Sequence, residues 1–280
     1  MSNPLSRANR IVKKHVDYHR KWKDAGLSKA EYFKLLRYPG GYLQPTTVNF
    51  RGSVTHFASP FWFLHSVQEI FIDEVYKFAP ERSDPTIIDC GANIGLSAIY
   101  FKTHWPDAKL IAFEPDPSVF DLLQKNVKER NLAAVDAQNA AIWIDDSKLR
   151  FEVEGALGGK LSDAAADGRQ QIEVQAFRLR DLLDSPVDFL KIDIEGAEYA
   201  VLRDCRDRLQ NVRNLFVEYH AAPDEPQRLN EMLSWFSEAG FRYYISEASQ
   251  LQPHPFISRG GDVFEMQLNI SCYRTTPASA

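Results

Sequence analysis

The stretch Thr86-Ile87-Ile88-Asp89-Cys90-Gly91-Ala92-Asn93-Ile94-Gly95 decides the fold of this chain. Its apolar start is typical of a buried strand, its glycines at Gly91 and Gly95 indicate a turn, and the apolar residues that follow predict a helix over 94–104. A strand, a glycine turn and a helix in this order are typical of a cofactor site at the carboxyl edge of a parallel sheet.

The glycine spacing distinguishes two classes of cofactor. Dinucleotide sites carry Gly-x-Gly-x-x-Gly, in which the middle glycine lets the backbone approach a pyrophosphate. Here Asn93 takes the middle position and the third glycine is absent. Asparagine adopts the left-handed turn conformation more readily than most residues, and a cofactor without a diphosphate does not need the cradle. The spacing therefore favours S-adenosylmethionine over NAD.

Two acidic residues frame this turn. Asp89 ends the first strand, where we expect it to accept a hydrogen bond from the cofactor's ammonium group, directly or through water. Gly91 would let the amino-acid part of the cofactor lie against bare backbone. Glu114 ends the next apolar run, 109–113, and an acidic residue at this topological position accepts hydrogen bonds from ribose hydroxyls.

Composition limits the remaining classes of protein. The chain has 280 residues, 44% hydrophobic and 25% charged, and no apolar run long enough to span a bilayer. A net charge of −5 argues against a duplex nucleic-acid partner, and the basic stretch 7–23 is interpreted as a solvated helix face. The start of the chain lacks a secretory pattern, so we expect a cytoplasmic protein whose three cysteines are reduced.

The rest of the chain alternates between short apolar runs and helical patterns. This predicts an α/β fold with a mostly parallel sheet, closed by an antiparallel pair over 241–245 and 264–273. Residues 1–80 are interpreted as a helical arm or cap, and 81–280 as the cofactor-binding domain. The predicted strands are 86–90, 109–113, 137–142, 187–192 and 214–217, the predicted helices are 94–104, 118–131, 197–209 and 227–239, and a loop over 155–168 lies between paired strands at 149–153 and 172–177.

Four blocks of sequence together resemble the FkbM-type family of S-adenosylmethionine-dependent methyltransferases. They are Ile88–Gly95, Ala112–Pro117, Leu190–Glu198 and Phe216–His220. The first two are shared across class I methyltransferases, whereas the third is close to diagnostic of this family. The resemblance implies a Rossmann-like, seven-stranded sheet with helices on both faces. It also implies methyl transfer to oxygen, often of a sugar or natural product, and Pro115 and Ala141 beside the cofactor.

The third block carries the candidate catalytic residues. Asp193 follows a central strand at its carboxyl end, where ligands of open α/β sheets bind, so it is a candidate for cofactor binding as well as catalysis. Glu195 stands in the following turn. A base near an acceptor hydroxyl typically raises the rate by a factor of about 10²–10⁴. Asp193, Glu195 and His220 are the candidates, although His220 fits a purely structural strand-end histidine equally well. We expect Glu198 to cap the next helix and to form a salt bridge with Lys191.

Other roles remain open at the sequence level. Asp193, Glu218 and His220 could converge on a divalent metal, but the chain lacks a compact ligand motif, and we expect a site without metal. Trp143 is a candidate stacking wall, and His56, Trp62 and His65 are candidates for the acceptor pocket. Each is equally explained by packing.

The sequence therefore predicts an S-adenosylmethionine-dependent O-methyltransferase acting on a small-molecule or glycan hydroxyl. An N-methyltransferase would be expected to carry an Asn-Pro-Pro-Tyr-type turn, and Asp193-Ile194-Glu195-Gly196 is not one. A nicotinamide-dependent oxidoreductase is disfavoured because Tyr199 is followed four positions later by Arg203 rather than lysine. A non-catalytic cofactor-binding module is the third alternative.

Overall fold

A seven-stranded sheet forms the centre of the computed structural model, which describes residues 20–38, 44–152, 160–161, 171–248, 254, 256–257 and 263–274. The strand order is β12-β13-β11-β10-β3-β4-β5; β13 is antiparallel to both neighbours and the other pairs are parallel. This confirms the predicted sheet and its antiparallel C-terminal pair. The strands are β3 Thr86–Cys90, β4 Lys109–Phe113, β5 Val135–Gln138, β10 Val187–Ile192, β11 Val212–Ala221, β12 Arg242–Glu247 and β13 Met266–Tyr273.

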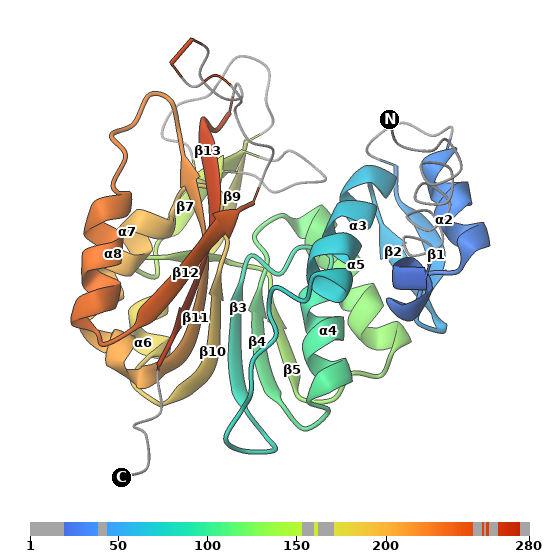
Figure 1. Cartoon of the computed structure of the whole chain (residues 1–280), viewed down its shortest axis with the longest axis horizontal. Coiled ribbons are helices and arrows are strands. Elements are labelled where there is room, and N and C mark those ends of the chain that lie inside the picture. The colour runs from blue at the N-terminus through green and yellow to red at the C-terminus, as the bar shows by residue number, and fades with distance from the viewer. Residues whose placement is uncertain are drawn as a thin grey trace, which may run out of the picture.

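Helices cover both faces of this sheet, as expected (Figure 1). The helices α3, α4 and α5 share one apolar cluster with the sheet, and α6, α7 and α8 share the other. Apolar side chains of these helices thus cover β10 and β3 on both faces of the sheet, which explains the continuous apolar sequences of the two strands. The helices are α3 Pro60–Val67, α4 Leu96–His104, α5 Pro117–Glu129, α6 Leu179–Leu182, α7 Glu198–Cys205 and α8 Leu229–Glu238.

The N-terminal segment contains a β-hairpin that the sequence analysis missed. After α2 (Lys29–Leu36), strands β1 (Thr46–Phe50) and β2 (Ser53–Phe57) pair antiparallel. Arg51 and Gly52 have φ of 52° and 78°, the backbone of a tight two-residue hairpin turn. The prediction of a purely helical arm is therefore wrong. An x-Gly pair between two short segments rich in Thr, Val and Phe was the sequence signal for a hairpin, and the structure shows buried and exposed residues alternating in both segments.

The segment before residue 80 packs directly on the central sheet. After α3 the helix continues as a π-helical turn, Gln68–Ile72, and the chain then reaches Tyr76, which is buried. The Tyr76 ring lies 4.9 Å from that of Phe216 on β11 and 5.9 Å from that of Phe101 on α4. One continuous core therefore joins the two parts of the chain. Most of the basic stretch 7–23 lies outside the described residues.

The third predicted strand, 137–142, is two strands in different sheets. β5 ends at Gln138 and joins the main sheet, whereas β6 (Ala141–Trp143) pairs with β9 in a small sheet of order β6-β9-β7-β8. Asn139 lies between β5 and β6, and its side chain donates a hydrogen bond to the carbonyl of Glu114. The predicted pairing of 149–153 with 172–177 is confirmed by β7 (Lys148–Glu152) and β9 (Gln171–Arg178), with the short β8 (Lys160–Leu161) beside them. The loop 155–168 lies largely outside the described residues.

Candidate active site

A pocket opens where β3, β4 and β10 end, at the carboxyl edge of the sheet. Such an edge is where open α/β sheets bind their ligands. Of the residues predicted to hold the cofactor, six line this pocket: Gly91, Asn93, Glu114, Pro115, Ala141 and Asp193. Glu195 lines it as well, together with Phe113, Ala140, Ile142, Phe151, Ile194 and Ala197.

The glycine turn has the backbone that the sequence predicts. Gly91 has φ of 86°, and a Cβ there would lie 1.8 Å from the carbonyl oxygen of Asp193. Asn93 adopts φ of 48°, the left-handed conformation expected of it. Gly95, which does not line the pocket, has φ of 83° and begins α4. The first glycine thus allows β3 and β10 to approach each other, while the other one starts the helix.

Glu114, the residue predicted to bind the ribose, lines the pocket directly after β4. It is buried, and its two oxygens each accept a 2.9 Å hydrogen bond, from the backbone N–H groups of Asn93 and Asp116. Burial raises the pKa of Glu114 to about 8, although these two donors oppose the shift. Since each carboxylate oxygen has a second lone pair, both remain able to accept from hydroxyl groups.

Replacing Glu114 with glutamine is expected to weaken S-adenosylmethionine binding about 10- to 100-fold. The amide would turn an NH₂ group toward one of the two backbone N–H donors, and a buried donor left without an acceptor costs about 1–3 kcal/mol. Isothermal titration calorimetry measures the change, with Asp121→Asn, an exposed acid paired with Lys125, as the control. An unchanged affinity would exclude Glu114 from cofactor binding.

Asp89 lies behind the pocket wall rather than in it. Its side chain is fully buried, its Oδ2 accepts a 2.5 Å hydrogen bond from Ser97 Oγ, and its Oδ1 lies 3.3 Å from Lys191 Nζ. We expected Asp89 to meet the cofactor's ammonium group directly or through water, and this geometry does not provide the direct contact. Asp89 instead neutralises a buried lysine, because an unpaired charge at this depth would be costly.

Lys191 joins the ends of β3 and β10. Its Nζ donates to the carbonyl of Gly91 at 2.8 Å and lies 3.2 Å from Asp193 Oδ2. Burial alone lowers the pKa of Lys191, but Asp193 and Asp89 more than compensate and raise it well above the ordinary lysine value. Lys191 is thus a buried, charged residue. The predicted salt bridge from Lys191 to Glu198 is wrong, because these two aspartates are its partners.

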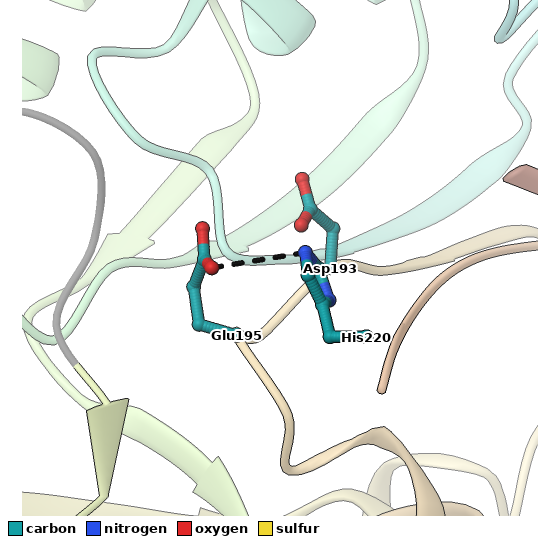
Figure 2. A group of neighbouring side chains, drawn as sticks. All are labelled: Asp193, Glu195 and His220. Atoms are coloured by element: carbon teal, nitrogen blue, oxygen red, sulfur yellow. Dashed lines mark ion pairs between the residues drawn. The ribbon is translucent and has the colours of Figure 1, made fainter. Parts of the chain in front are cut away.

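His220 on β11 brings the candidate catalytic residues together (Figure 2). Its buried ring has Nδ1 3.0 Å from Glu198 Oε1, while Nε2 lies 3.7 Å from Glu195 Oε2 and 3.5 Å from Glu218 Oε1. Burial alone lowers the pKa of His220, but these carboxylates, Glu198 above all, raise it well above its ordinary value.

Glu198 is the first residue of α7 and does not cap the helix as predicted, because its side chain binds backbone N–H groups of the turn before the helix. Its Oε1 accepts from the backbone N–H of Ile194 at 3.0 Å, and both of its oxygens accept from Gly196 N–H at 3.1 Å. The same Oε1 meets the His220 ring. Glu198 therefore connects the start of α7 to β11.

The turn between β10 and α7 points Glu195 into the pocket. Glu195 has φ of 55° and Gly196 has φ of 102°, two consecutive left-handed residues that reverse the chain. Burial raises the pKa of Glu195 to about 8, with the positive charge of His220 opposing the shift. Asp193, Glu195 and His220 each offer one ligand atom, and these atoms lie within 4.8 Å of one another, which makes them the residues able to hold a metal ion here.

Glu69 is a site residue that the sequence analysis missed. The π-helical turn carries it over the sheet, where Asn269 Nδ2 of β13 donates to its Oε1 at 2.9 Å. Burial and the nearby charge of Glu218 raise the pKa of Glu69 to about 7. Glu218 and Asn269 are opposite each other in the strand register, so their side chains lie on the same face. No local sequence pattern predicts a contact across 200 residues.

The remaining aromatic and histidine candidates lie elsewhere. Trp143 packs against the cluster below α6–α8 and is absent from the pocket lining. The His56 ring lies 3.8 Å from Glu129, so it helps to hold the hairpin on α5. Trp62 and His65 contact each other on α3, and His65 borders a second, aromatic cavity. Among the described residues, no helix is long and apolar enough to cross a membrane.

Comparison with known proteins assigns the family. The model of the methyltransferase FkbM domain matches residues 89–243. Methyltransferase 1 of Beauveria bassiana is 32% identical over 169 residues, covering 52% of this chain and 67% of that protein. The hexuronic acid methyltransferase AglP of Haloferax volcanii is 29% identical, covering 55% and 63%. The 2-O-methyltransferase NoeI of Sinorhizobium fredii is 27% identical, covering 50% and 65%. The chain therefore belongs to the FkbM methyltransferase family and is an S-adenosylmethionine-dependent methyltransferase.

Proposed function

We propose that this enzyme transfers the methyl group to a hydroxyl of a sugar, glycan precursor or secondary metabolite. The observation that supports this best is the group formed by Asp193, Glu195 and His220, which borders the same pocket as Glu114. The cofactor supplies an electrophilic methyl group on a positively charged sulfur. An alcohol becomes a good nucleophile only when it loses its proton, and this acidic and imidazole edge provides groups to receive it.

Two relatives support the acceptor class. One is named for hexuronic acid and another for 2-O-methylation, and both match about half of this chain. Carbohydrates present several hydroxyls, which suits a pocket edge rich in carboxylate acceptors. The acceptor itself is expected to contact residues on several elements, including the segment before residue 80.

The proposed activity can be tested with cofactor carrying a deuterated methyl group. The enzyme is incubated with a panel of methyl glycosides, including glucuronides and rhamnosides, and with amine analogues of the same sugars. Mass spectrometry finds the labelled product, and NMR locates the methyl group on oxygen or nitrogen. Labelled O-methyl products support the proposal. Products methylated only on nitrogen would overturn it in favour of N-methyl transfer, and cofactor binding without any product would favour a non-catalytic module.

We also propose that residues 1–80 form an acceptor-side cap on the methyltransferase domain 81–280. Glu69 carries this proposal, because it reaches from the π-helical turn to Asn269 beside the acidic edge. Glu69→Gln is expected to lower kcat/KM for the acceptor about 10-fold or more, since a hydrogen bond to a charged group contributes about 1.5–3 kcal/mol. Cofactor affinity should not change.

Steady-state kinetics with the best acceptor of the panel measure this effect. Glu74→Gln is the matched control, because Glu74 belongs to the same segment but pairs with Lys77 at the surface. Equal kinetics for both variants would remove Glu69 from the acceptor site.

A further inference from the structure

The two nitrogens of the His220 ring have different kinds of neighbour. Nδ1 lies 3.0 Å from Glu198, a hydrogen-bond distance, whereas Nε2 lies 3.5 Å from Glu218 and 3.7 Å from Glu195. N–H···O hydrogen bonds are usually about 2.7–3.2 Å long. Ligands held about 2.1 Å from one octahedral cation are separated by about 3.0 Å when adjacent and about 4.2 Å when opposite. The Nε2 distances therefore lie in the range of co-ligands.

The ring is also held in the orientation that a metal ligand needs. Metal-binding histidines usually donate their other N–H to a carboxylate, which sets both the tautomer and the direction of the free nitrogen. Glu198 supplies that carboxylate, and it is itself fixed by the backbone N–H groups of Ile194 and Gly196. Because the His220 side chain is only 1% exposed, the ring has little freedom to turn away.

Acidic groups outnumber basic ones in the contacts at this edge. Lys191, a buried cation beside it, already contacts Asp89 and Asp193. The other acidic side chains, on Glu195, Glu198 and Glu218, lie around the His220 ring. A cation held beside Glu195 and Glu218 would have several oxygen ligands within reach.

We propose that Asp193, Glu195 and His220, with Glu218 beside them, bind a divalent cation of the Mg²⁺ and Mn²⁺ class. Carboxylate oxygens with a single imidazole suit such cations better than thiolate-preferring metals. The three ligand atoms converge from the end of β10 and from β11, next to the pocket (Figure 2). The role of the cation rests on the proposed function: it would bind the acceptor hydroxyl and lower its pKa, so that the proton leaves more easily.

Binding of Mn²⁺ to the full-length protein tests the site without any acceptor. Protein freed of metal with a chelator is titrated with Mn²⁺, and free Mn²⁺ is followed by electron paramagnetic resonance. One bound Mn²⁺ per chain, displaced by Mg²⁺, is the expected result. Glu195→Gln, which changes a partly exposed side chain, should weaken binding at least 10-fold, and Glu198→Gln about 10- to 100-fold. Asp121→Asn, far from this edge on the surface of α5, should not change it.

The outcomes separate the proposed cation from the proposed reaction. No Mn²⁺ binding at millimolar concentration, or equal binding by wild type and Glu195→Gln, overturns the cation site even if O-methylation is found. Binding that depends on Glu195 supports the site even if every acceptor in the panel fails. Thermal melting followed by circular dichroism checks that Glu195→Gln is folded, so loss of binding by an unfolded protein is not counted as support.

Discussion

Replacing Asp193 with asparagine is expected to lower turnover about 10²–10⁴-fold and to leave the fold intact. The substitution keeps the shape of the side chain and the backbone carbonyl that lies against Gly91, but it removes a negative charge from the pocket edge. Loss of a group that helps to remove the acceptor's proton costs a factor of this size. Lys191 retains Asp89 as a partner, so the buried cation is not left alone.

Single-turnover kinetics and cofactor calorimetry on the same variant distinguish two roles for Asp193. Slow methyl transfer with cofactor affinity close to wild type would assign Asp193 to the acceptor side. A large loss of cofactor affinity with normal chemistry at saturation would assign it to the cofactor instead. A variant that does not fold would show that Asp193 serves the structure first, through its contact with Lys191.

Gly91→Ala is expected to destabilise the protein by more than about 4 kcal/mol and to abolish cofactor binding. The new methyl group would lie 1.8 Å from the carbonyl oxygen of Asp193 and 3.0 Å from its carbonyl carbon. Both atoms belong to the backbone, so no side-chain rotation relieves the overlap. The ends of β3 and β10 would have to separate, which also disrupts the Lys191 contacts between them.

Gly52→Ala provides a matched control for this prediction. Gly52 also has positive φ, at 78°, but a Cβ there meets nothing within 4 Å. Its substitution therefore measures the cost of a left-handed backbone for alanine alone, about 1–2 kcal/mol. Urea unfolding of both variants gives the difference, which reports the steric contact at Gly91. Similar unfolding free energies for the two variants would contradict the predicted overlap.

Local sequence was sufficient for the cofactor side of the site. The turn from Gly91 to Gly95 and the strand-end Glu114 are each specified within one strand–turn–helix unit, because the backbone conformation there depends on adjacent residues. The parallel sheet could be predicted for a related reason. Strands buried on both faces are apolar throughout, and such apolar runs are visible in the sequence. The hairpin over 46–57 is short and lies between helical segments, so the helical patterns on either side of it dominate the prediction for this part of the chain.

Partners distant in the sequence could not be predicted in this way. The sequence pattern predicts a salt bridge between Lys191 and Glu198, seven positions later, whereas in the fold Lys191 contacts Asp89 on β3 and Glu198 contacts His220 on β11. These pairings depend on strand order, since only neighbours in the sheet bring such residues together. Asp89 is a further example. Only the assembled sheet shows that its side chain is buried behind the pocket wall.

The sequence by itself determined the class of enzyme and its cofactor, and it predicted the glycine turn and Glu114 at the carboxyl edge of the sheet. These depend on short-range conformational preferences and apolar patterning, which adjacent residues express directly. The tertiary structure alone decided which carboxylate lies beside each nitrogen of His220, and that Glu69 reaches Asn269 across the sheet. Those features arise from through-space electrostatics and packing between elements, and such interactions have no fixed spacing along a chain.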